Sequence, residues 1–465
     1  MLLSVTAAGA RVKLHGLVSN NAVMQQKTTV NIAGTAAPGA TVTVTASWDG
    51  KTSTTVADSD GWWSTLVKTP AAGGPYTLTA SDGEPVTVSN ILIGEVWICS
   101  GQSNMELRLS TLTRDMPVIG SAEAIASADG YPMIRCFDVQ RALTMEPQKD
   151  VAGHWEISGT KTTPKMSAVA WFFAREIVDR TGVPVGIVTD AWSGSRIEAW
   201  MPLELLEGYE DVQLTGFDPK SDKPHLLPMM IYNGMHRPLS SCAARGFLWY
   251  QGESNSDHNI RYADKMRDMV ARWRKDWKNE NMPFYYVQLC PLTGNRKDGG
   301  MRVRIEQQRA MGIIPHSGMI STVDLGSNLL HPLDKQNVGK RLAYWALAKD
   351  YGVKTPFLGP EPVSAHLAVT GEGGAKEAVI EMKMSGTGSG LRTDAEEQIA
   401  GFEIAGADSV FMAVAARITG KDMVTITVPK GTEPRYVQFS YRYPVIGKIY
   451  SSDMLPPYPF ILSVK

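Results

Sequence analysis

Short apolar runs alternate with longer segments of helical periodicity between about Asn90 and Gly352, and this alternation restricts the fold more than any other feature. Strands that alternate with helices predict an α/β fold, a largely parallel sheet covered by helices. The apolar residues of segment 260–278 recur at helical spacing, which predicts a core-facing helix. The expected strands are ILIGEVWICS, VPVGIVTD, GFLWYQ, PFYYVQLC and MISTVDLG. The expected helices are SAVAWFFAREIVDRTG, whose final glycine is suited to end it, residues 260–278, and PLDKQNVGKRLAYWALAKDYG.

The segments on either side of this region have a different texture. Residues 1–89 contain short Thr- and Val-rich runs, such as ATVTVTASWDG, separated by Gly, Asp and Pro turns, and this pattern is typical of a β-sandwich. Strand-like runs such as EAVIEMKM and MVTITVPK return after residue 352. The sequence therefore predicts an N-terminal β-sandwich domain over 1–89, an α/β domain over 90–352 and a C-terminal β-rich domain over 353–465.

Composition excludes several classes of partner. The 46 basic and 47 acidic residues nearly balance, so we expect no broad positive surface and no nucleic-acid partner. No run approaches the roughly 18 uncharged apolar residues of a membrane span, so we expect no membrane insertion. The opening MLLSVTAAGA resembles the tail of a secretory signal without its charged start, which predicts a secreted or periplasmic protein.

The sequence also offers no metal motif. The four cysteines lie far apart, with no short spacing of a zinc or redox site, and are expected to be buried apolar residues. His236, His258 and His316 show no spacing suited to a metal ion. We therefore expect no metal and no organic cofactor.

Four polar stretches each follow an expected strand. They contain Ser103 in GQSNM, Gly194 in AWSGSRIEAW, Gln251 and Glu253 in QGESNSDHN, and His331 in SNLLHP. Because the carboxyl ends of parallel strands share one edge of a sheet, the four loops are expected to converge on one crevice.

These residue types suit acyl transfer. A serine hydroxyl becomes an effective nucleophile when a histidine removes its proton, and the tetrahedral oxyanion then needs fixed donors. The N–H groups of Ser103 and Gly194 and the carboxamide of Gln251 are groups of this kind. Structural roles compete: Ser103 as a helix N-cap, His331 as a cap before its proline, and Gln251 as a partner of loop backbone. The spacing does not match the Gly-x-Ser-x-Gly motif of α/β-hydrolases.

The blocks GEVWICSGQSNMEL, GSRIEAWMP, FLWYQGESN and HPLDKQNVGKRLAYWAL resemble the sialate O-acetylesterase family, a branch of the SGNH hydrolases that includes bacterial carbohydrate acetylesterases. The resemblance implies a three-layer, flavodoxin-like catalytic sheet. It also implies that Ser103 is the nucleophile, His331 the general base, and Gly194 and Gln251 oxyanion donors. Asn104 and Trp200 are candidates for substrate contact, although an aromatic residue in such a position is commonly part of the core.

The acid partner of His331 is open, because relatives usually read Asp-Ile-His-Pro where this chain reads Leu-Leu-His-Pro. Neither Leu329 nor Asn328 can carry the charge. Asp324, Asp334 and Glu253 are the alternatives, of which we favour Glu253; a Ser-His dyad with the imidazole held by a backbone carbonyl is the other possibility. The match also departs where relatives often have Gly-Gly-Thr-Pro and this chain has Ser-Gly-Ser-Arg over residues 193–196.

The sequence thus predicts a serine esterase that removes O-acetyl groups from sialic acid or related glycans through an acetyl-serine intermediate. Two alternatives remain. One is an esterase that acts on acetylxylan or another plant glycan. The other is a catalytically inactive, glycan-binding protein.

Overall fold

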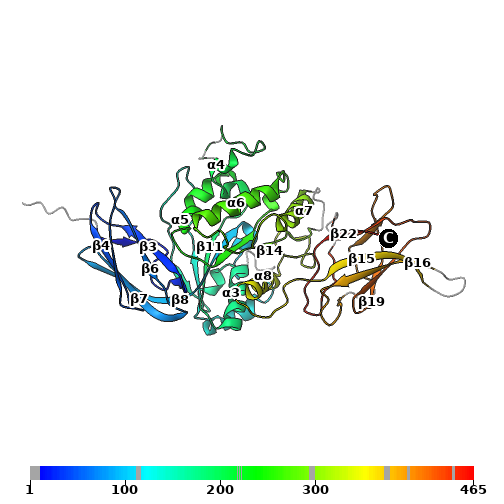
Figure 1. Cartoon of the computed structure of the whole chain (residues 1–465), viewed down its shortest axis with the longest axis horizontal. Coiled ribbons are helices and arrows are strands. Elements are labelled where there is room, and N and C mark those ends of the chain that lie inside the picture. Colours follow the sequence, from blue (N-terminus) through cyan, green and yellow to red (C-terminus); the bar gives the residue numbers. More distant parts are fainter. Residues whose placement is uncertain are drawn as a thin grey trace, which may run out of the picture. The chain divides into compact units, whose positions relative to one another are not determined.

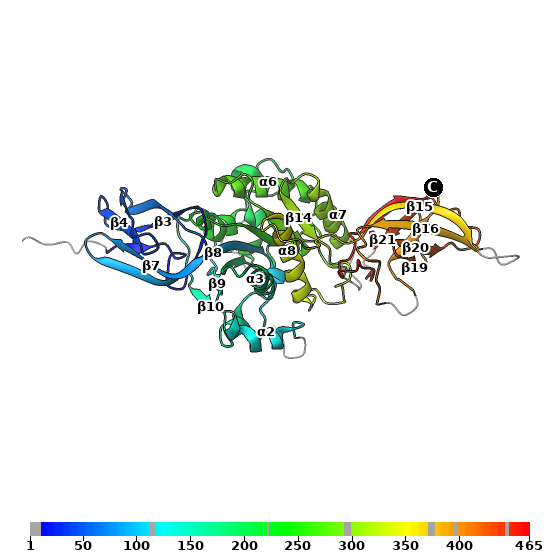
Figure 2. The same cartoon turned by 60° about the horizontal axis from the view of Figure 1, so that its bottom comes forward.

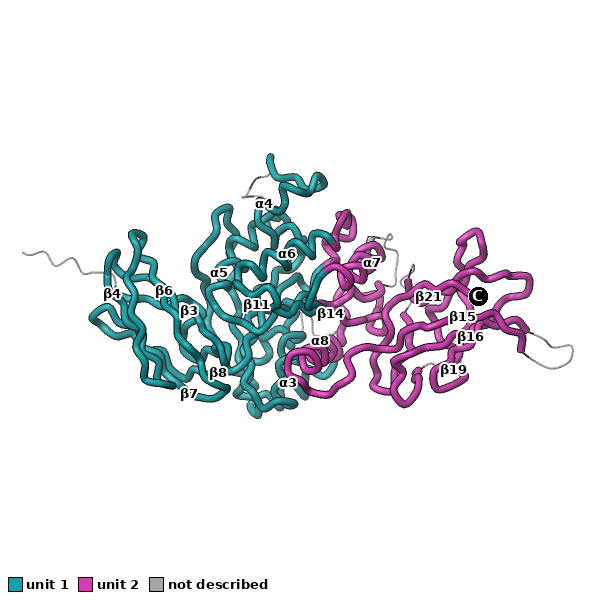
Figure 3. Tube along the Cα trace, in the orientation of Figure 1, with its two compact units in different colours: residues 1–251, 264–285, 314–317 teal, residues 252–263, 286–313, 318–465 magenta. Residues whose placement is uncertain are grey.

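The structure is a computed structural model that describes residues 11–110, 117–216, 218, 220, 223–292, 299–370, 377–394, 398–441 and 446–465. The expected export signal, residues 1–10, lies outside this range. Within the described ranges no helix is long and apolar enough to span a membrane. The chain forms two compact units, one of residues 1–251, 264–285 and 314–317, the other of residues 252–263, 286–313 and 318–465 (Figure 3).

Seven strands of a larger, eleven-stranded mixed sheet form the centre of the α/β region, which confirms the α/β prediction (Figure 1). Strands β9, β11, β8 and β12 are parallel neighbours, and β10 pairs antiparallel with β9. Their carboxyl ends therefore share one edge, where ligands of open α/β sheets bind. The strand order is β10 (Trp155–Ile157), β9 (Ile134–Asp138), β11 (Val185–Ala191), β8 (Pro85–Gly101), β12 (Gly246–Tyr250), β13 (Phe284–Val287) and β14 (Ser317–Ile320).

Strand β8 links two regions of this sheet. Its first part alternates exposed and buried residues and pairs with β7 (Gly73–Ser81), whereas every residue from Ile93 to Gly101 is buried. That last part pairs with β11 and β12. The predicted boundary between residues 89 and 90 falls inside this strand. The change of residue pattern at that boundary therefore reflects a change of burial within one strand.

The N-terminal β region consists of two groups of strands around a shared apolar core. Ile32, Val44, Trp63 and Leu78 belong to this core and come from both groups. One sheet has the order β1 (Lys13–Leu14), β3 (Thr29–Thr35) and β6 (Trp62–Lys68); the other group, part of the eleven-stranded sheet, contains β2 (Val23–Gln25), β4 (Thr41–Ala46), β5 (Thr52–Val56) and β7.

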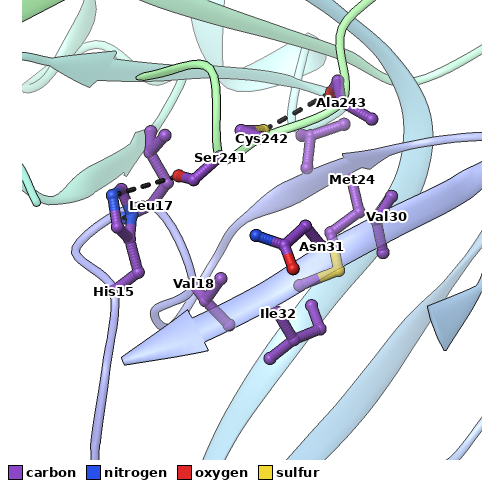
Figure 4. A pocket seen from close by; sticks show the side chains of 11 residues that line it. His15, Leu17, Val18, Met24, Val30, Asn31, Ile32, Ser241, Cys242 and Ala243 are labelled. Carbon is purple, nitrogen blue, oxygen red and sulfur yellow. Dashed lines mark hydrogen bonds between the residues drawn. The ribbon is translucent and has the colours of Figure 1, made fainter. Parts of the chain in front are cut away.

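A small cavity lies beside strand β3 in this unit (Figure 4). His15 and Ser241 lie at its wall, with 3.1 Å between Nε2 and Oγ, and Met24, Val30 and Ile32 supply apolar surface. Its volume of about 20 Å³ is enough for about one water molecule. A sugar ring does not fit, so this cavity is no rival to the sheet edge as a substrate site.

All three expected helices are confirmed. Helix α3 (Ala168–Thr181) packs on β9 and β11, is capped by the Ser167 side chain, and ends at Gly182, whose φ of 66° suits glycine. The other two are α6 (Tyr262–Asp276), with a buried apolar face, and α8 (Lys335–Lys349). The remaining α-helices of the described ranges are α1 (Ser103–Glu106), α2 (Ser121–Ser127), α4 (Leu203–Leu206), α5 (Arg237–Leu239) and α7 (Gly299–Met311).

The C-terminal region of the second unit is antiparallel β structure around its own core (Figure 2). Ile380, Ile404, Val424 and Phe439 lie in that core and come from two sheets. The first sheet has the order β15 (Glu361–Thr370), β16 (Glu377–Ser385), β20 (Met423–Thr427) and β19 (Ala416–Gly420); the second has β18 (Met412–Ala413), β17 (Phe402–Ala405), β21 (Tyr436–Phe439) and β22 (Phe460–Ser463).

One strand prediction was displaced. The run MISTVDLG was expected to be a strand, but β14 ends at Ile320. The Thr322 hydroxyl instead donates to the carbonyl of Gln288 at 2.7 Å, and the Asp324 carboxylate pairs with Arg341. After the strand has ended, polar side chains in this run therefore form a hydrogen bond and an ion pair with residues of other segments.

Candidate active site

Ser103 follows the carboxyl end of β8 and is the first residue of α1. The preceding Gly101 has φ of 143°, and a Cβ there would collide with the carbonyl oxygen of Tyr250, so the turn requires glycine. The Gln102 N–H donates to that same carbonyl at 3.0 Å. The N-cap residue of α1 is Gln102, so the competing N-cap role of Ser103 is not the one the structure has. Ser103 thus lies at the sheet edge, and the residue is only 9% exposed.

The Gly194 loop follows β11 and is tied to the serine's turn. The Trp192 N–H donates to the carbonyl of Gly101 at 2.9 Å, and the Ser193 N–H donates to Glu106 Oε2 at 2.8 Å. Gly194 has φ of 78°, a conformation that favours glycine. The structure therefore brings the Ser103 turn and the Gly194 loop together, as expected for parallel neighbours.

Gln251 directly follows β12 and is fully buried. Its amide Nε2 donates to the carbonyl of Ser195 at 3.0 Å, which fastens the end of β12 to the Gly194 loop. The backbone-bonding role considered for this side chain is therefore present. The oxyanion role expected of the same side chain stays a prediction.

The two residues expected to touch substrate are both buried. Asn104 is 1% exposed and Trp200 is not exposed at all. The Trp200 indole N–H donates to Ser195 Oγ at 3.0 Å, and its ring packs edge-on against Trp249 with centroids 5.5 Å apart. For Trp200 this surrounding favours the core interpretation over stacking on a sugar.

A buried polar network beneath the same strand ends was not predicted. Ser100 and Asp190 are paired neighbours on β8 and β11, and the Ser100 hydroxyl donates to Asp190 Oδ1 at 2.5 Å. The other carboxylate oxygen lies 2.7 Å from Nδ1 of His236, and all three side chains are fully buried. Burial raises the pKa of Asp190, an effect that His236 opposes. The sequence signal was a hydroxyl and a carboxyl at the ends of otherwise apolar strands.

His331 lies in the second unit, in the segment between β14 and α8. Its partial burial, and then the positive charge of Lys335, lower the pKa of the imidazole below its ordinary value of 6.5. Lys335 is itself fully buried, and burial lowers its pKa to about 8 against the opposing charges of Cys290, Glu253 and Asp334. His331 is thus neutral at neutral pH, which is the form that accepts a proton.

Two of the three acids considered as partners of His331 have structural roles, one in an ion pair and one as a helix cap. Asp324 forms a buried, two-point ion pair with Arg341, at 2.8 and 2.6 Å. Asp334 is the N-cap of α8 and accepts the N–H of Asn337 at 2.9 Å. Glu253 begins a short 3₁₀ helix directly after Gly252 and lies close enough to Lys335 to raise the pKa of that lysine.

No group of three or more His, Cys, Asp or Glu side chains suited to a metal ion exists among the described residues. All four cysteines are unbridged. Cys99 and Cys136 are buried, and burial raises the pKa of both thiols, that of Cys136 to about 12. Cys242 and Cys290 are partly exposed.

Comparisons with known proteins agree on one family. Residues 93–347 match the family model described as "Carbohydrate esterase, sialic acid-specific acetylesterase". The chain belongs to this family. Sialate O-acetylesterase of Mus musculus is 28% identical over 433 residues, 78% of this chain and 78% of that protein. The Homo sapiens sialate O-acetylesterase is 27% identical over 401 residues, 78% and 75% of the two chains.

A solved structure extends the likeness to nearly the whole chain. The carbohydrate acetylesterase from Xanthomonas citri covers 97% of this chain and is itself covered to 99%, with 30% identity and a TM-score of 0.83. Family membership and this structural match confirm the prediction that the protein is a carbohydrate esterase.

Proposed function

We propose that this esterase removes O-acetyl groups from sialic acid or related glycans through an acetyl-serine intermediate on Ser103. The observation that carries the proposal is the junction of the Ser103 turn, the Gly194 loop and Gln251 at the carboxyl edge of parallel strands. Membership of the sialic acid-specific acetylesterase family supports the substrate class. We also propose that the sheet is of the three-layer SGNH type.

Each proposed role follows from ester chemistry. Ser103 Oγ attacks the acetyl carbonyl while His331 takes its proton, and the backbone N–H groups of Ser103 and Gly194 with the Gln251 amide hold the oxyanion. Collapse breaks the bond to the sugar oxygen, which takes the proton from His331 and leaves as the sugar hydroxyl, and the acetyl group stays on Ser103. Water, activated by the same imidazole, then releases acetate and restores the hydroxyl.

We assign the carboxylate that orients His331 to Glu253. Glu253 lies close enough to Lys335 to raise the pKa of that lysine, and Lys335 in turn lowers the pKa of His331, which supports a Glu253 carboxylate near the imidazole. A carboxylate in this role fixes the imidazole tautomer and stabilises the imidazolium formed during attack. A Ser-His dyad is the competing assignment.

Acetate release from matched substrates tests the proposal. Wild-type protein is incubated with O-acetylated sialic acid and with acetylated xylan, and acetate is measured alongside Ser103→Ala. We expect release from the sialic acid substrate that disappears in Ser103→Ala, with thermal melting unchanged. Faster release from xylan favours the plant-glycan alternative. Glycan binding without any acetate release favours the inactive-binder alternative.

The predicted secreted or periplasmic location remains a proposal of its own. Fractionation of expressing cells tests it, and recovery of the protein only with cytoplasmic markers would contradict it.

A further inference from the structure

Three side chains form a stack beside the Gly194 loop. The Arg141 guanidinium lies 4.9 Å from the centre of the Trp192 ring, and the His225 ring is stacked on Trp192 with centroids 6.1 Å apart and an angle of 16° between planes. Arg141 is exposed, and Trp192 and His225 are partly exposed. We call these three residues the Arg-Trp-His stack. No sequence pattern indicated this stack, because Arg141 lies in an irregular segment and His225 lies far from it in the chain, in a short 3₁₀ helix.

The stack is tied to the serine's own helix. Glu106, the last residue of α1, forms an ion pair with Arg141, and its other carboxylate oxygen accepts the Ser193 N–H at 2.8 Å. Ser103 begins the same four-residue helix. One carboxylate thus holds Arg141 and the residue after Trp192 at a fixed place relative to the proposed nucleophile.

His225 also approaches the proposed oxyanion loop. A Cβ at Gly194 would lie 3.2 Å from His225 Nε2, which is tighter than ordinary side-chain contacts allow. Burial, and then the charges of Arg141 and Lys223, lower the pKa of His225 below 6.5. Its imidazole is therefore neutral at pH 7 and carries one donor and one acceptor, as a sugar hydroxyl does.

The charges around the stack favour an acidic sugar. Arg141 and Lys223 are positive, and Glu106 is the acid that pairs with Arg141. A guanidinium has five N–H donors in a fixed fork, and one carboxylate uses at most two of them in a side-by-side pair. An arginine that already pairs with one carboxylate therefore has N–H donors with which to bind a second carboxylate.

We propose that the Arg-Trp-His stack receives the sugar that carries the acetyl ester, and that Arg141 selects sugars bearing a carboxylate. The face of the His225 ring that is turned away from Trp192 packs on sugar C–H surface, and the His225 ring nitrogens bond to sugar hydroxyls. This inference rests on the proposed function, which supplies the ester chemistry at Ser103.

The test compares an acidic and a neutral substrate. For wild type and Arg141→Gln, kcat/KM is measured on O-acetylated sialic acid and on an uncharged acetylated monosaccharide, each divided by the value on 4-nitrophenyl acetate. We expect the acidic-to-neutral ratio to fall about tenfold in Arg141→Gln, mainly through KM. An unchanged ratio would contradict the proposal that Arg141 selects acidic sugars. This includes the case in which kcat/KM falls equally on both sugars.

Arg175→Gln is the matched control. The Arg175 guanidinium also lies over a tryptophan, 5.7 Å from the Trp171 ring centre, and pairs with Asp179 at 3.7 Å on helix α3. The acidic-to-neutral ratio of Arg175→Gln is expected to equal that of wild type. A fall as large as that of Arg141→Gln would also contradict the assignment.

Failure of the proposed function is distinguishable from failure of this inference. If wild type releases no acetate from either sugar, the proposed function fails. Calorimetric titration with free sialic acid then tests the stack directly: weaker binding by Arg141→Gln than by Arg175→Gln supports it, and equal affinity overturns it.

Discussion

The two regions that carry the proposed chemistry are held in different ways. The region of Ser103, Gly194 and Gln251 is fixed by hydrogen bonds between neighbouring strand ends and is supported by the buried Ser100–Asp190–His236 network. The region of His331 is a partly buried segment after β14, whose electrostatics are governed by the buried Lys335. Backbone geometry thus defines the first region, and charge defines the second. Substitutions should separate them. In the first region they should lower the rate without moving the pH profile, and in the second the substitution of Lys335 should move the pH profile.

The largest effect is expected from the acid proposed for the second region. Glu253→Gln should lower kcat by about 10⁴-fold, because the amide cannot stabilise the imidazolium that forms on His331. Steady-state kinetics on an acetyl ester provide the measurement, with thermal melting to confirm the fold. Nearly full activity in Glu253→Gln, together with loss of activity in a folded Asp324→Asn, would show that Asp324 is the acid that orients His331.

The next effect probes the first region. Gln251→Ala should lower kcat by about 100-fold if its carboxamide helps hold the oxyanion. Gln251→Ala and Gln251→Glu, which keeps the chain length, both lose the bond to the Ser195 carbonyl, so the thermal melting of each variant is measured beside its kinetics. A change confined to KM in both variants would make Gln251 a substrate-binding residue.

The smallest effect is a displaced pH profile. Lys335 lowers the pKa of His331, and Lys335→Met should therefore raise that pKa. Because His331 must be neutral to accept a proton, wild-type kcat/KM should fall only below pH 6.5, and the acidic limb of the variant should move to higher pH. Lys340→Met on the same helix is the control, for which we expect no movement. An acidic limb at the same pH in Lys335→Met and wild type would contradict the electrostatic role.

The first region could be predicted from sequence more fully than the second. The strands that lead to Ser103, Gly194 and Gln251 are continuous apolar runs, and parallel pairing alone places their carboxyl ends together. Helix α6 was predictable because its apolar residues recur at helical spacing, and α3 and α8 carry capping side chains at their starts. Helix α7 was missed, because its sequence opens on two glycines and is rich in charge.

The remainder depended on contacts between distant segments. The pairing of Asp324 with Arg341 could not be predicted, because the run through Asp324 has the pattern of a strand. The burial of Lys335 was equally hidden, since a lysine at the start of a helix is ordinarily exposed. The Arg-Trp-His stack joins three segments that no periodicity connects.

Trapping the intermediate tests the central claim most directly. Wild-type protein is mixed with an acetylated substrate, quenched in acid within the first turnovers, digested and examined by peptide mass spectrometry, with Ser103→Ala treated in parallel. The account predicts an acetyl group on Ser103 and nearly complete loss of turnover in a folded Ser103→Ala protein. An acetyl group on another residue, or wild-type rates in Ser103→Ala, would contradict it.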